Sequence, residues 1–298
     1  MTQEHLEEYY RDYKRNYLSL HNTPYPLMKA DTIDDYPAWI RSLNTPLVLS
    51  FDFHDTLTAH NERVMTEQDS IIFAQLMDTV LARYELPIIP IIHSVGNIFT
   101  THELDTKNTF YLITEGHILH NDHMTSTEQI SLLDDSQQRI ADQIKVYIQQ
   151  QSPQTRLVDH DQDELLIQLS TIPTVSQTSL SNEELSEALS EFFPRELADQ
   201  ASFWINRHHD VLGVHARVGK NQVSQKLLHH LGQNSSEYTY VHFGDHTPDI
   251  LWHDTDFLHN VLITPFNATQ QTKDFASYAD ACCAPENVLS FLEDLLKR

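Results

Sequence analysis

The sequence predicts an α/β protein built on a parallel sheet, and two observations support this prediction. Residues 46–53 (PLVLSFDF) and 86–94 (LPIIPIIHS) are short apolar runs, as expected of strands that are buried on both faces of a parallel sheet. Between them, residues 70–84 carry apolar side chains at helical spacing. A strand, a helix and a second strand in this order form a βαβ unit, in which the two strands run parallel.

The same alternation returns towards the end of the chain. Residues 221–231 form an amphipathic helical pattern that stops at Gly232. Strand patterns follow at 238–243 and 261–264, and a helical pattern covers 284–296. The core of the protein is therefore predicted from two separate stretches of sequence.

The middle of the chain has a different character. Residues 109–122 (TFYLITEGHILHND) indicate two short strands around a turn. From about 124 to 212 the sequence is rich in Gln and Ser, and helical patterns alternate with strand patterns such as 163–170 (DELLIQLS). Because apolar periodicity persists, we predict an inserted α+β domain rather than a linker.

These patterns predict three parts. Residues 1–44 form a helical extension, which either packs beside the core or binds a protein partner. Residues 45–116 and 213–298 form the parallel-sheet core, and residues 117–212 form the inserted domain. The sequence does not decide between the two roles of the extension.

The composition restricts the function. Hydrophobic residues make up 40% of the chain, which is enough for a substantial core. Against 19 Lys and Arg stand 43 Asp and Glu, which gives a formal net charge of −24. A field this negative repels nucleic acid and anionic lipid, so we expect neither as a partner. It also repels a phosphorylated substrate unless a cation or a basic group lies in the site.

Further features favour a cytoplasmic protein. Cys282 and Cys283 are adjacent, and adjacent cysteines rarely form a disulfide, which fits a reducing compartment. The chain contains no run of 18 apolar residues, and its N-terminus is charged rather than apolar. We therefore expect neither a membrane span nor a secretory signal.

Polar groups end three of the predicted strands. Asp52 and His54 follow the first strand, Ser94 ends the second, and Asp245 follows the strand at 238–243. In an open α/β sheet, ligands bind just beyond the carboxyl ends of the strands. These side chains are therefore expected at one edge of the sheet, around one site.

The residue types at this edge suit metal-assisted phosphoryl transfer. Mg²⁺ prefers oxygen ligands, commonly one or two carboxylates, and a carboxylate can also act as a nucleophile. A hydroxyl such as that of Thr56 or Ser94 and an ammonium such as that of Lys220 can hold phosphoryl oxygens. A bound cation would also offset the repulsion between the acidic protein and an anionic substrate.

Four segments, in order, resemble the motifs of the haloacid dehalogenase superfamily. FDFHDTLT resembles the first motif, D-x-D-G-T-L, and Ser94 after a buried strand resembles the second. VGKNQVSQKLLHHLG resembles the third, a lysine that opens a helix, and FGDHTPDI resembles the fourth, G-D-x-x-x-D. YLITEGHILHND and DVLGVHARVGK are similar to the segments that flank the inserted cap of Cof-type, sugar-phosphatase-like members. The resemblance covers residues 45–298 and implies a Rossmann-like core with an inserted α+β cap domain.

The resemblance also implies an activity and its catalytic residues. It implies a Mg²⁺-dependent phosphatase that hydrolyses a small phosphomonoester, with sugar phosphates as one candidate class. Asp52 would be the nucleophile and a metal ligand. His54 occupies the position of the general acid/base Asp, and its backbone carbonyl would face the metal. Lys220 would neutralise the charge of the phosphoryl group.

The remaining positions of the motifs would bind substrate and metal. Thr56 and Ser94 would donate hydrogen bonds to the phosphoryl group. Asp245 would ligate Mg²⁺, and Asp249 would ligate it or orient a bound water. The residues of the insert carry no recognisable code for the leaving group of the substrate.

Several of these positions also have a simpler interpretation. Asp245 and Asp249 can cap a helix, and Ser94 can serve the turn after its strand. Lys220 can be a surface lysine, with Lys226 as the rival phosphate-binding residue. The paired histidines at 208–209 and 229–230 are expected on the surface rather than around zinc, because no Cys/His spacing accompanies them.

One departure from the family pattern lies in the first motif. His54 replaces the second Asp, and Asp55 replaces the Gly. Imidazole can donate and accept the required proton near neutral pH, although its cationic form is disfavoured beside Mg²⁺. Two alternatives therefore stand beside an active phosphatase: a catalytically weak protein that binds a phosphorylated ligand or a protein partner, and a phosphomutase or phosphotransferase.

Overall fold

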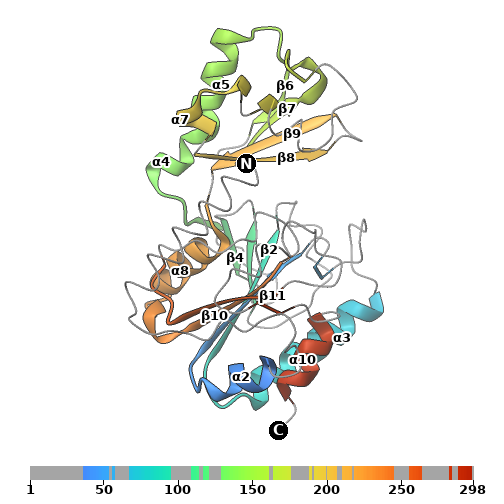
Figure 1. Cartoon of the computed structure of the whole chain (residues 1–298), viewed down its shortest axis with the longest axis vertical. Helices are drawn as coiled ribbons and strands as arrows, with labels where there is room; N and C mark the ends of the chain where they lie inside the picture. Colours follow the sequence, from blue (N-terminus) through green and yellow to red (C-terminus); the bar gives the residue numbers. More distant parts are fainter. Residues whose placement is uncertain are drawn as a thin grey trace. The chain divides into compact units, whose positions relative to one another are not determined.

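The computed structural model describes residues 36–53, 56–57, 67–94, 109–113, 117–120, 129–160, 164–175, 188–189, 191–198, 200–206, 210–216, 218–244, 255–263, 282–283 and 288–296. These residues form two compact units (Figure 1). One runs from Leu133 to Val218, and the other consists of the described residues up to Leu132 and from Gly219 onward. We call them the insert unit and the core unit.

The core unit is built on one eight-stranded sheet with the order β12-β11-β10-β1-β2-β3-β4-β5. Its strands are β1 (Leu47–Asp52), β2 (Ile88–Ser94), β3 (Phe110–Ile113), β4 (His117–His120), β5 (Gln129–Ser131), β10 (Thr239–Phe243), β11 (His259–Ile263) and β12 (Cys282–Cys283). The pairs from β12 to β3 are parallel, and β4 and β5 extend the sheet antiparallel. The predicted α/β core with a parallel sheet is confirmed.

The strand order reverses direction at β1. From β1 the chain moves outward through β2 and β3, and it later returns to the other side of β1 with β10, β11 and β12. The boundary between β1 and β10 is therefore the topological switch point of the sheet. Ligands of open α/β sheets bind at the carboxyl ends of the strands beside such a point.

One face of this sheet is apolar and carries three helices, α2 (Tyr36–Ser42), α3 (Glu67–Arg83) and α10 (Val288–Leu296) (Figure 1). Alternate residues of β1, such as Leu49 and Phe51, point to this face because successive strand residues face opposite sides. Phe73, Met77 and Val80 of α3 recur at helical spacing and are buried against them. This layer is the main hydrophobic core of the unit.

The opposite face carries α8 (Lys220–His230) and is much more polar. The intervening residues of the strands, including Ser50 of β1, His93 of β2 and His242 of β10, are buried on that side. The helix contributes both apolar side chains, such as Val223 and Leu227, and polar ones to the same interface. The functional side chains described below belong to this layer.

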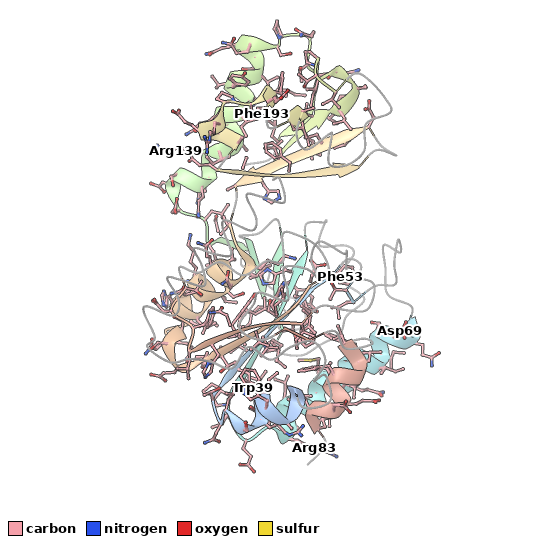
Figure 2. All side chains as sticks on the ribbon, in the orientation of Figure 1. Trp39, Phe53, Asp69, Arg83, Arg139 and Phe193 are labelled. Carbon is pink, nitrogen blue, oxygen red and sulfur yellow. The ribbon has the colours of Figure 1, made fainter. Side chains whose placement is uncertain are left out.

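The insert unit is an α+β structure. Its antiparallel sheet has the order β6-β7-β9-β8, formed by β6 (Leu157–His160), β7 (Glu164–Gln168), β8 (Ala201–Asn206) and β9 (Val211–Ala216). The helical elements are α4 (Asp135–Gln138), α5 (Ile140–Gln151), η3 (Leu169–Thr171) and α7 (Arg195–Ala198). Ile140, Ile144 and Ile148 form the buried stripe of α5. Phe193, which is labelled in Figure 2, stacks on Phe203 with 5.3 Å between the ring centroids.

The insert unit lies further along the chain than the expected 117–212. β4 and β5 belong to the core sheet, because β4 pairs with β3 and β5 pairs with β4. At the other end, β9 belongs to the insert sheet, since it pairs with β7 on one side and β8 on the other. The strand at 211–216, which we expected to lead the chain back into the core, is thus one of the two inner strands of the insert sheet. Of the expected N-terminal extension, the structure describes only residues from 36 on.

No helix among the described residues is both long enough and apolar enough to cross a membrane.

Candidate active site

An aspartate and a lysine meet at the switch point of the sheet. Lys220 Nζ donates a hydrogen bond to Asp52 Oδ1 at 2.5 Å, and the two groups form an ion pair. The lysine side chain is 4% exposed and the aspartate side chain 11%. A charge-assisted bond in such a poorly solvated place is strong, and it holds both groups in a defined orientation.

The position of Asp52 follows from the strand that ends in it. Every residue of β1 is buried, and Asp52 is its last residue. Asp52 points to the same side of the sheet as Ser50, which faces α8, because strand residues two apart share a face. The backbone N–H of Phe53 donates to the carbonyl of His93 at 2.9 Å and extends the pairing one residue beyond the strand. The carboxylate is therefore carried by a rigid element.

Lys220 is positioned by the start of a helix. It is the first residue of α8, and Gly219 before it has an extended backbone. Gln222 Oε1 accepts a hydrogen bond from the Gly219 N–H at 2.8 Å, which satisfies a donor that the helix cannot use. Val223 N–H donates to the Gly219 carbonyl and closes the first turn. Lys226, the rival lysine, lies one and a half turns later and is partly exposed.

Thr56 lies in the turn that follows β1. Thr56 is buried, with 8% of its surface exposed. The N–H of the next residue, Leu57, donates a hydrogen bond to the Phe53 carbonyl at 3.1 Å and closes the turn. This turn places Thr56 just beyond the carboxyl end of β1, four positions after Asp52. The structure thus describes a carboxylate, an ammonium and a buried hydroxyl-bearing residue at one end of β1 and α8.

The other expected site residues are described in part or not at all. Ser94 is the last residue of β2 and pairs in register with Ile113, and its side chain lies outside the description. His54, Asp245 and Asp249 lie outside the described residues. These positions therefore remain predictions.

A cation at this site would find carboxylate oxygen. Asp52 supplies a carboxylate, the kind of hard oxygen donor that Mg²⁺ prefers. Phe51 and Phe243 pair in register, so Asp52 and Gly244 follow at adjacent strand ends, and Asp245 comes next in the sequence. Within the described ranges no group of three or more His, Cys, Asp or Glu side chains is arranged to hold a metal. The Asp52 carboxylate is thus a ligand of the type that suits Mg²⁺. The other expected ligands, His54, Asp245 and Asp249, lie outside the described residues.

Sequence reasoning missed a set of buried polar residues beside the ion pair, on the strand next to Asp52 and on the helix of Lys220. His93 Nε2 lies 3.2 Å from Ser224 Oγ of α8, and both residues are buried. On the other side of Lys220, Asn221 Nδ2 lies 3.4 Å from both Thr255 Oγ1 and Asn260 Oδ1. The available signal was a histidine inside an otherwise apolar strand run, which reads equally well as the start of a loop.

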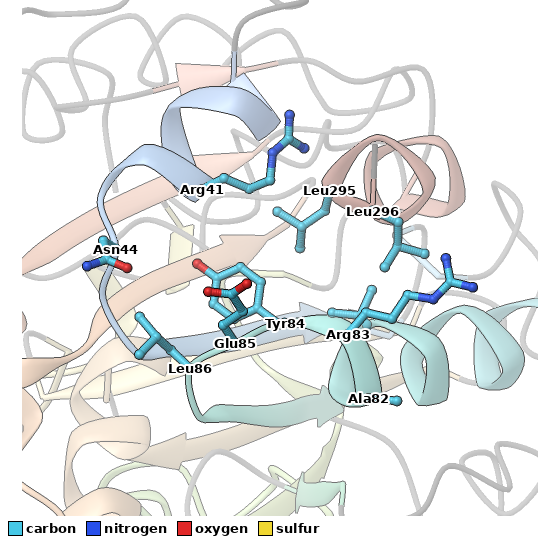
Figure 3. Close-up of a pocket in the computed structure, with 10 residues that line it drawn as sticks. Arg41, Asn44, Ala82, Arg83, Tyr84, Glu85, Leu86, Leu295 and Leu296 are labelled. Carbon is cyan, nitrogen blue, oxygen red and sulfur yellow. The ribbon is translucent and has the colours of Figure 1, made fainter. Parts of the chain in front are cut away.

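A cavity of about 620 Å³ lies elsewhere in the core unit (Figure 3). It is lined by Arg41, Asn44, Val80, Ala82, Arg83, Tyr84, Glu85, Leu86, Leu295 and Leu296. Asn44 precedes β1 and Leu86 precedes β2, so this cavity is at the amino ends of the strands, whereas Asp52 is at a carboxyl end. We therefore assign it no part in the chemistry at Asp52.

The fold is similar to that of solved haloacid dehalogenase-like hydrolases, in agreement with the fold that the sequence motifs implied. Among solved structures, the chain is similar to the sucrose-phosphatase from Synechocystis sp. PCC6803, determined in complex with sucrose and phosphate. The TM-score is 0.55 at 11% identity, with 84% of this chain and 96% of that chain covered.

Two further structures are similar over comparable lengths. The trehalose-6-phosphate phosphatase from Aspergillus fumigatus has a TM-score of 0.53 at 10% identity, covering 91% of this chain and 97% of that one. A haloacid dehalogenase-like hydrolase from Bacteroides thetaiotaomicron also has a TM-score of 0.53, at 14% identity, with coverages of 84% and 99%. At these identities the likeness shows the fold. No protein-family model and no curated protein sequence matches the chain.

Proposed function

We propose that this protein is a Mg²⁺-dependent phosphatase that hydrolyses a small phosphomonoester through an aspartyl-phosphate on Asp52. The observation that carries the proposal is the buried ion pair between Asp52 and Lys220 at the switch point of the sheet. A carboxylate held by an ammonium at this place combines a nucleophile with a positive charge for the phosphoryl oxygens. The order of the four sequence motifs agrees with it.

In the first step, a carboxylate oxygen of Asp52 attacks phosphorus in line with the bond to the leaving oxygen. The P–O bond to the substrate alcohol breaks as the Asp52–phosphoryl bond forms, and His54 gives a proton to the leaving oxygen. In the second step, water attacks the aspartyl-phosphate and gives a proton to His54. Inorganic phosphate leaves, and the Asp52 carboxylate is restored.

Lys220 and Thr56 bind the group that is transferred. The Lys220 ammonium holds Asp52 before the reaction and a phosphoryl oxygen during it, so its charge stays where negative charge develops. The Thr56 hydroxyl donates to a second oxygen, and the Ser94 hydroxyl to a third. Mg²⁺, held by Asp52, the His54 carbonyl, Asp245 and Asp249, would offset the charge repulsion between the acidic protein and its substrate.

The substrate class is proposed from the fold comparison and the insert unit. Two similar structures are phosphatases of sugar phosphates by name, the sucrose-phosphatase and the trehalose-6-phosphate phosphatase. Inserted units of this kind cover the site and select the leaving group in the family that the motifs resemble. Sugar phosphates are therefore the first substrates to test, while the insert residues that would select among them are not identified.

Phosphate release tests the proposal. Purified protein with Mg²⁺ is expected to release phosphate from para-nitrophenyl phosphate or from a member of a sugar-phosphate panel, and EDTA is expected to abolish the release. Asp52→Asn is expected to be inactive at wild-type protein concentration. Phosphate release by Asp52→Asn equal to that of the wild type would contradict the assignment of the nucleophile.

His54 motivates the main alternative, a protein that binds a phosphorylated ligand without turning it over. His54→Asp restores the residue type that the family uses at this position. Turnover that appears only in His54→Asp would favour the binding protein, whereas turnover in the wild type supports the phosphatase. Transfer of the phosphoryl group to a second sugar instead of water would indicate a phosphotransferase.

A further inference from the structure

We propose that His93 is a positioning residue for Lys220, acting through its hydrogen bond to Ser224. In this view the buried polar layer under α8 fixes the first turn of the helix over the sheet. The ammonium of Lys220 is thereby kept on the carboxylate of Asp52. Only the kinetic consequence rests on the proposed phosphatase activity, since the geometry of the ion pair can be measured without it.

His93 and Asp52 are neighbours across two strands. They are direct register partners in the parallel pair of β2 and β1, and both side chains lie on the α8 side of the sheet. His93 Nε2 lies 3.2 Å from Ser224 Oγ, with exposures of 1% for His93 and 0% for Ser224. The two neighbouring strands therefore contact α8 at two of its residues: His93 of β2 contacts Ser224, and Asp52 of β1 contacts Lys220.

Ser224 and Lys220 are one helical turn apart. Residues at i and i+4 lie above one another on the same face of a helix, so a shift of Ser224 along the sheet carries Lys220 with it. Asn221 holds the same turn from the other side, through Thr255 and Asn260 of the segment that leads into and forms β11. Ser224 thus contacts β2, Lys220 contacts β1, and Asn221 contacts β11.

His93 also contacts a polar side chain of β10. Its ring meets the ring of His242 edge to face, with centroids 5.9 Å apart and an interplanar angle of 90°. His242 Nδ1 lies 2.9 Å from Ser50 Oγ, which accepts a hydrogen bond from the Tyr240 hydroxyl at 2.9 Å. The polar layer is therefore continuous from β10 through β2 to α8.

Directional contacts suit this task better than apolar ones. Apolar packing of Val223 and Leu227 holds α8 against the sheet, but such contacts change little when a helix slides by a fraction of a turn. A buried hydrogen bond has a narrow range of distance and angle, and losing it leaves polar groups without partners. A misplacement of about 1 Å at a reacting group can cost a hundredfold in rate.

The test measures the reactivity of one lysine amine. Native protein is treated with a trace of acetic anhydride, and the acetylation rates of Lys220 and Lys226 are compared by mass spectrometry. Lys226 is on the same helix and partly exposed, so it serves as the internal reference. In the wild type Lys220 is expected to react slowly, because it is buried and paired with Asp52.

Three variants and one control decide the outcome. His93→Leu and Ser224→Ala each remove the bond and are expected to raise the Lys220-to-Lys226 ratio at least about threefold. His93→Gln keeps a side-chain nitrogen near the Nε2 position and is expected to restore most of the wild-type ratio. Tyr84→Phe removes a buried hydroxyl on the opposite, apolar side of the sheet and is expected to leave the ratio unchanged.

Kinetics supply a second reading. With a substrate that the wild type hydrolyses, His93→Leu is expected to lower kcat about tenfold or more while KM changes less than threefold. A wild-type ratio in both His93→Leu and Ser224→Ala, with circular dichroism spectra like that of the wild type, would overturn the positioning role. A wild type without phosphatase activity overturns the proposed function instead, and the acetylation ratio still decides the role of His93.

Discussion

Lys220 Nζ lies 2.5 Å from Asp52 Oδ1, although the two residues are 168 positions apart in the sequence. Between them in the chain come the rest of the first βαβ unit, the β3–β4–β5 extension and the whole insert unit. The sheet order brings them together, because α8 lies over the face to which the end of β1 points. This relationship is the basis of the predictions on activity.

The ion pair itself is expected to show strong energetic coupling. Lys220→Met removes the cationic partner of a buried carboxylate and is expected to lower the free energy of unfolding by about 3 kcal/mol. Asp52→Asn leaves the ammonium with a neutral partner. The double variant is expected to lose clearly less than the sum of the single losses, as urea denaturation at pH 7 would measure. Additive losses would mean that the pair contributes no coupling.

Thr56 is expected to act through its hydroxyl rather than its bulk. Thr56→Val keeps the shape and removes the donor, and it is expected to lower kcat/KM by about tenfold to a hundredfold, as for a hydrogen bond to a charged group. Thr56→Ser keeps the donor and is the matched control, with a loss of less than about threefold. Equal losses in the two variants would assign Thr56 to packing.

Two tyrosines offer a matched stability test. The Tyr84 hydroxyl is buried and has no hydrogen-bond partner among the described residues, whereas the Tyr240 hydroxyl donates to Ser50. Tyr84→Phe is therefore expected to keep or raise the free energy of unfolding, and Tyr240→Phe to lower it by about 1 kcal/mol. A larger loss for Tyr84→Phe than for Tyr240→Phe would contradict this reading of the two sites.

Tyr84 also predicts a pH dependence. Burial raises the pKa of its phenol above the ordinary value of 10.0, and the nearby charge of Arg41 lowers it by less. The folded state therefore keeps the proton to a higher pH than the unfolded state, so stability falls as pH rises above the unfolded value. Urea denaturation between pH 9 and 11 is expected to show a shallower fall for Tyr84→Phe than for the wild type.

Asp210 predicts an acid-sensitive contact in the insert unit. It has a positive φ of 56°, and its carboxylate accepts hydrogen bonds from the Ser170 N–H, the Ser170 hydroxyl and Gln168 Nε2. Burial raises its pKa, but these hydrogen bonds together lower the pKa by more than burial raises it, so the pKa is below the ordinary value of 3.8. The contact therefore stabilises the unit above the unfolded pKa, and this contribution is lost as pH falls through the lower folded pKa.

Amide hydrogen exchange over residues 164–175 measures this contact. In the wild type, the protection factor of the Ser170 amide is expected to fall between about pH 4 and pH 2, because the contact is lost below the ordinary pKa of 3.8. Asn at position 210 tolerates the same backbone conformation but does not titrate. In Asp210→Asn the protection factor of the Ser170 amide is therefore expected to stay constant over this pH range. An identical fall in the wild type and the variant would rule out Asp210 as the source.

The sequence was a good guide where a pattern is local. Apolar runs predicted β1, β2, β10 and β11, and helical spacing predicted α3 and α8, since burial on both faces or on one stripe leaves a periodic record. β12 has two residues, too few to carry any period. The sheet to which β4, β5 and β9 belong depends on tertiary pairing, so the boundaries of the insert shifted.

The site follows the same division. Strand ends and the start of a helix pointed to Asp52 and Lys220, because parallel topology brings such ends together. His93 and Ser224 were not predicted, since a polar side chain acquires its function there only from the partner across the layer. No local pattern in the sequence distinguishes such a buried pair from ordinary loop or helix residues.

Chemical trapping of the phosphorylated protein tests the central claim most directly. The protein is mixed with Mg²⁺ and its best substrate, quenched in acid within the first turnover, and reduced with borohydride, which converts an aspartyl-phosphate to homoserine. Mass spectrometry is expected to find homoserine at position 52 in the wild type and none in Asp52→Asn. Turnover with no modification at Asp52, or with the phosphoryl group on another residue, would contradict the account.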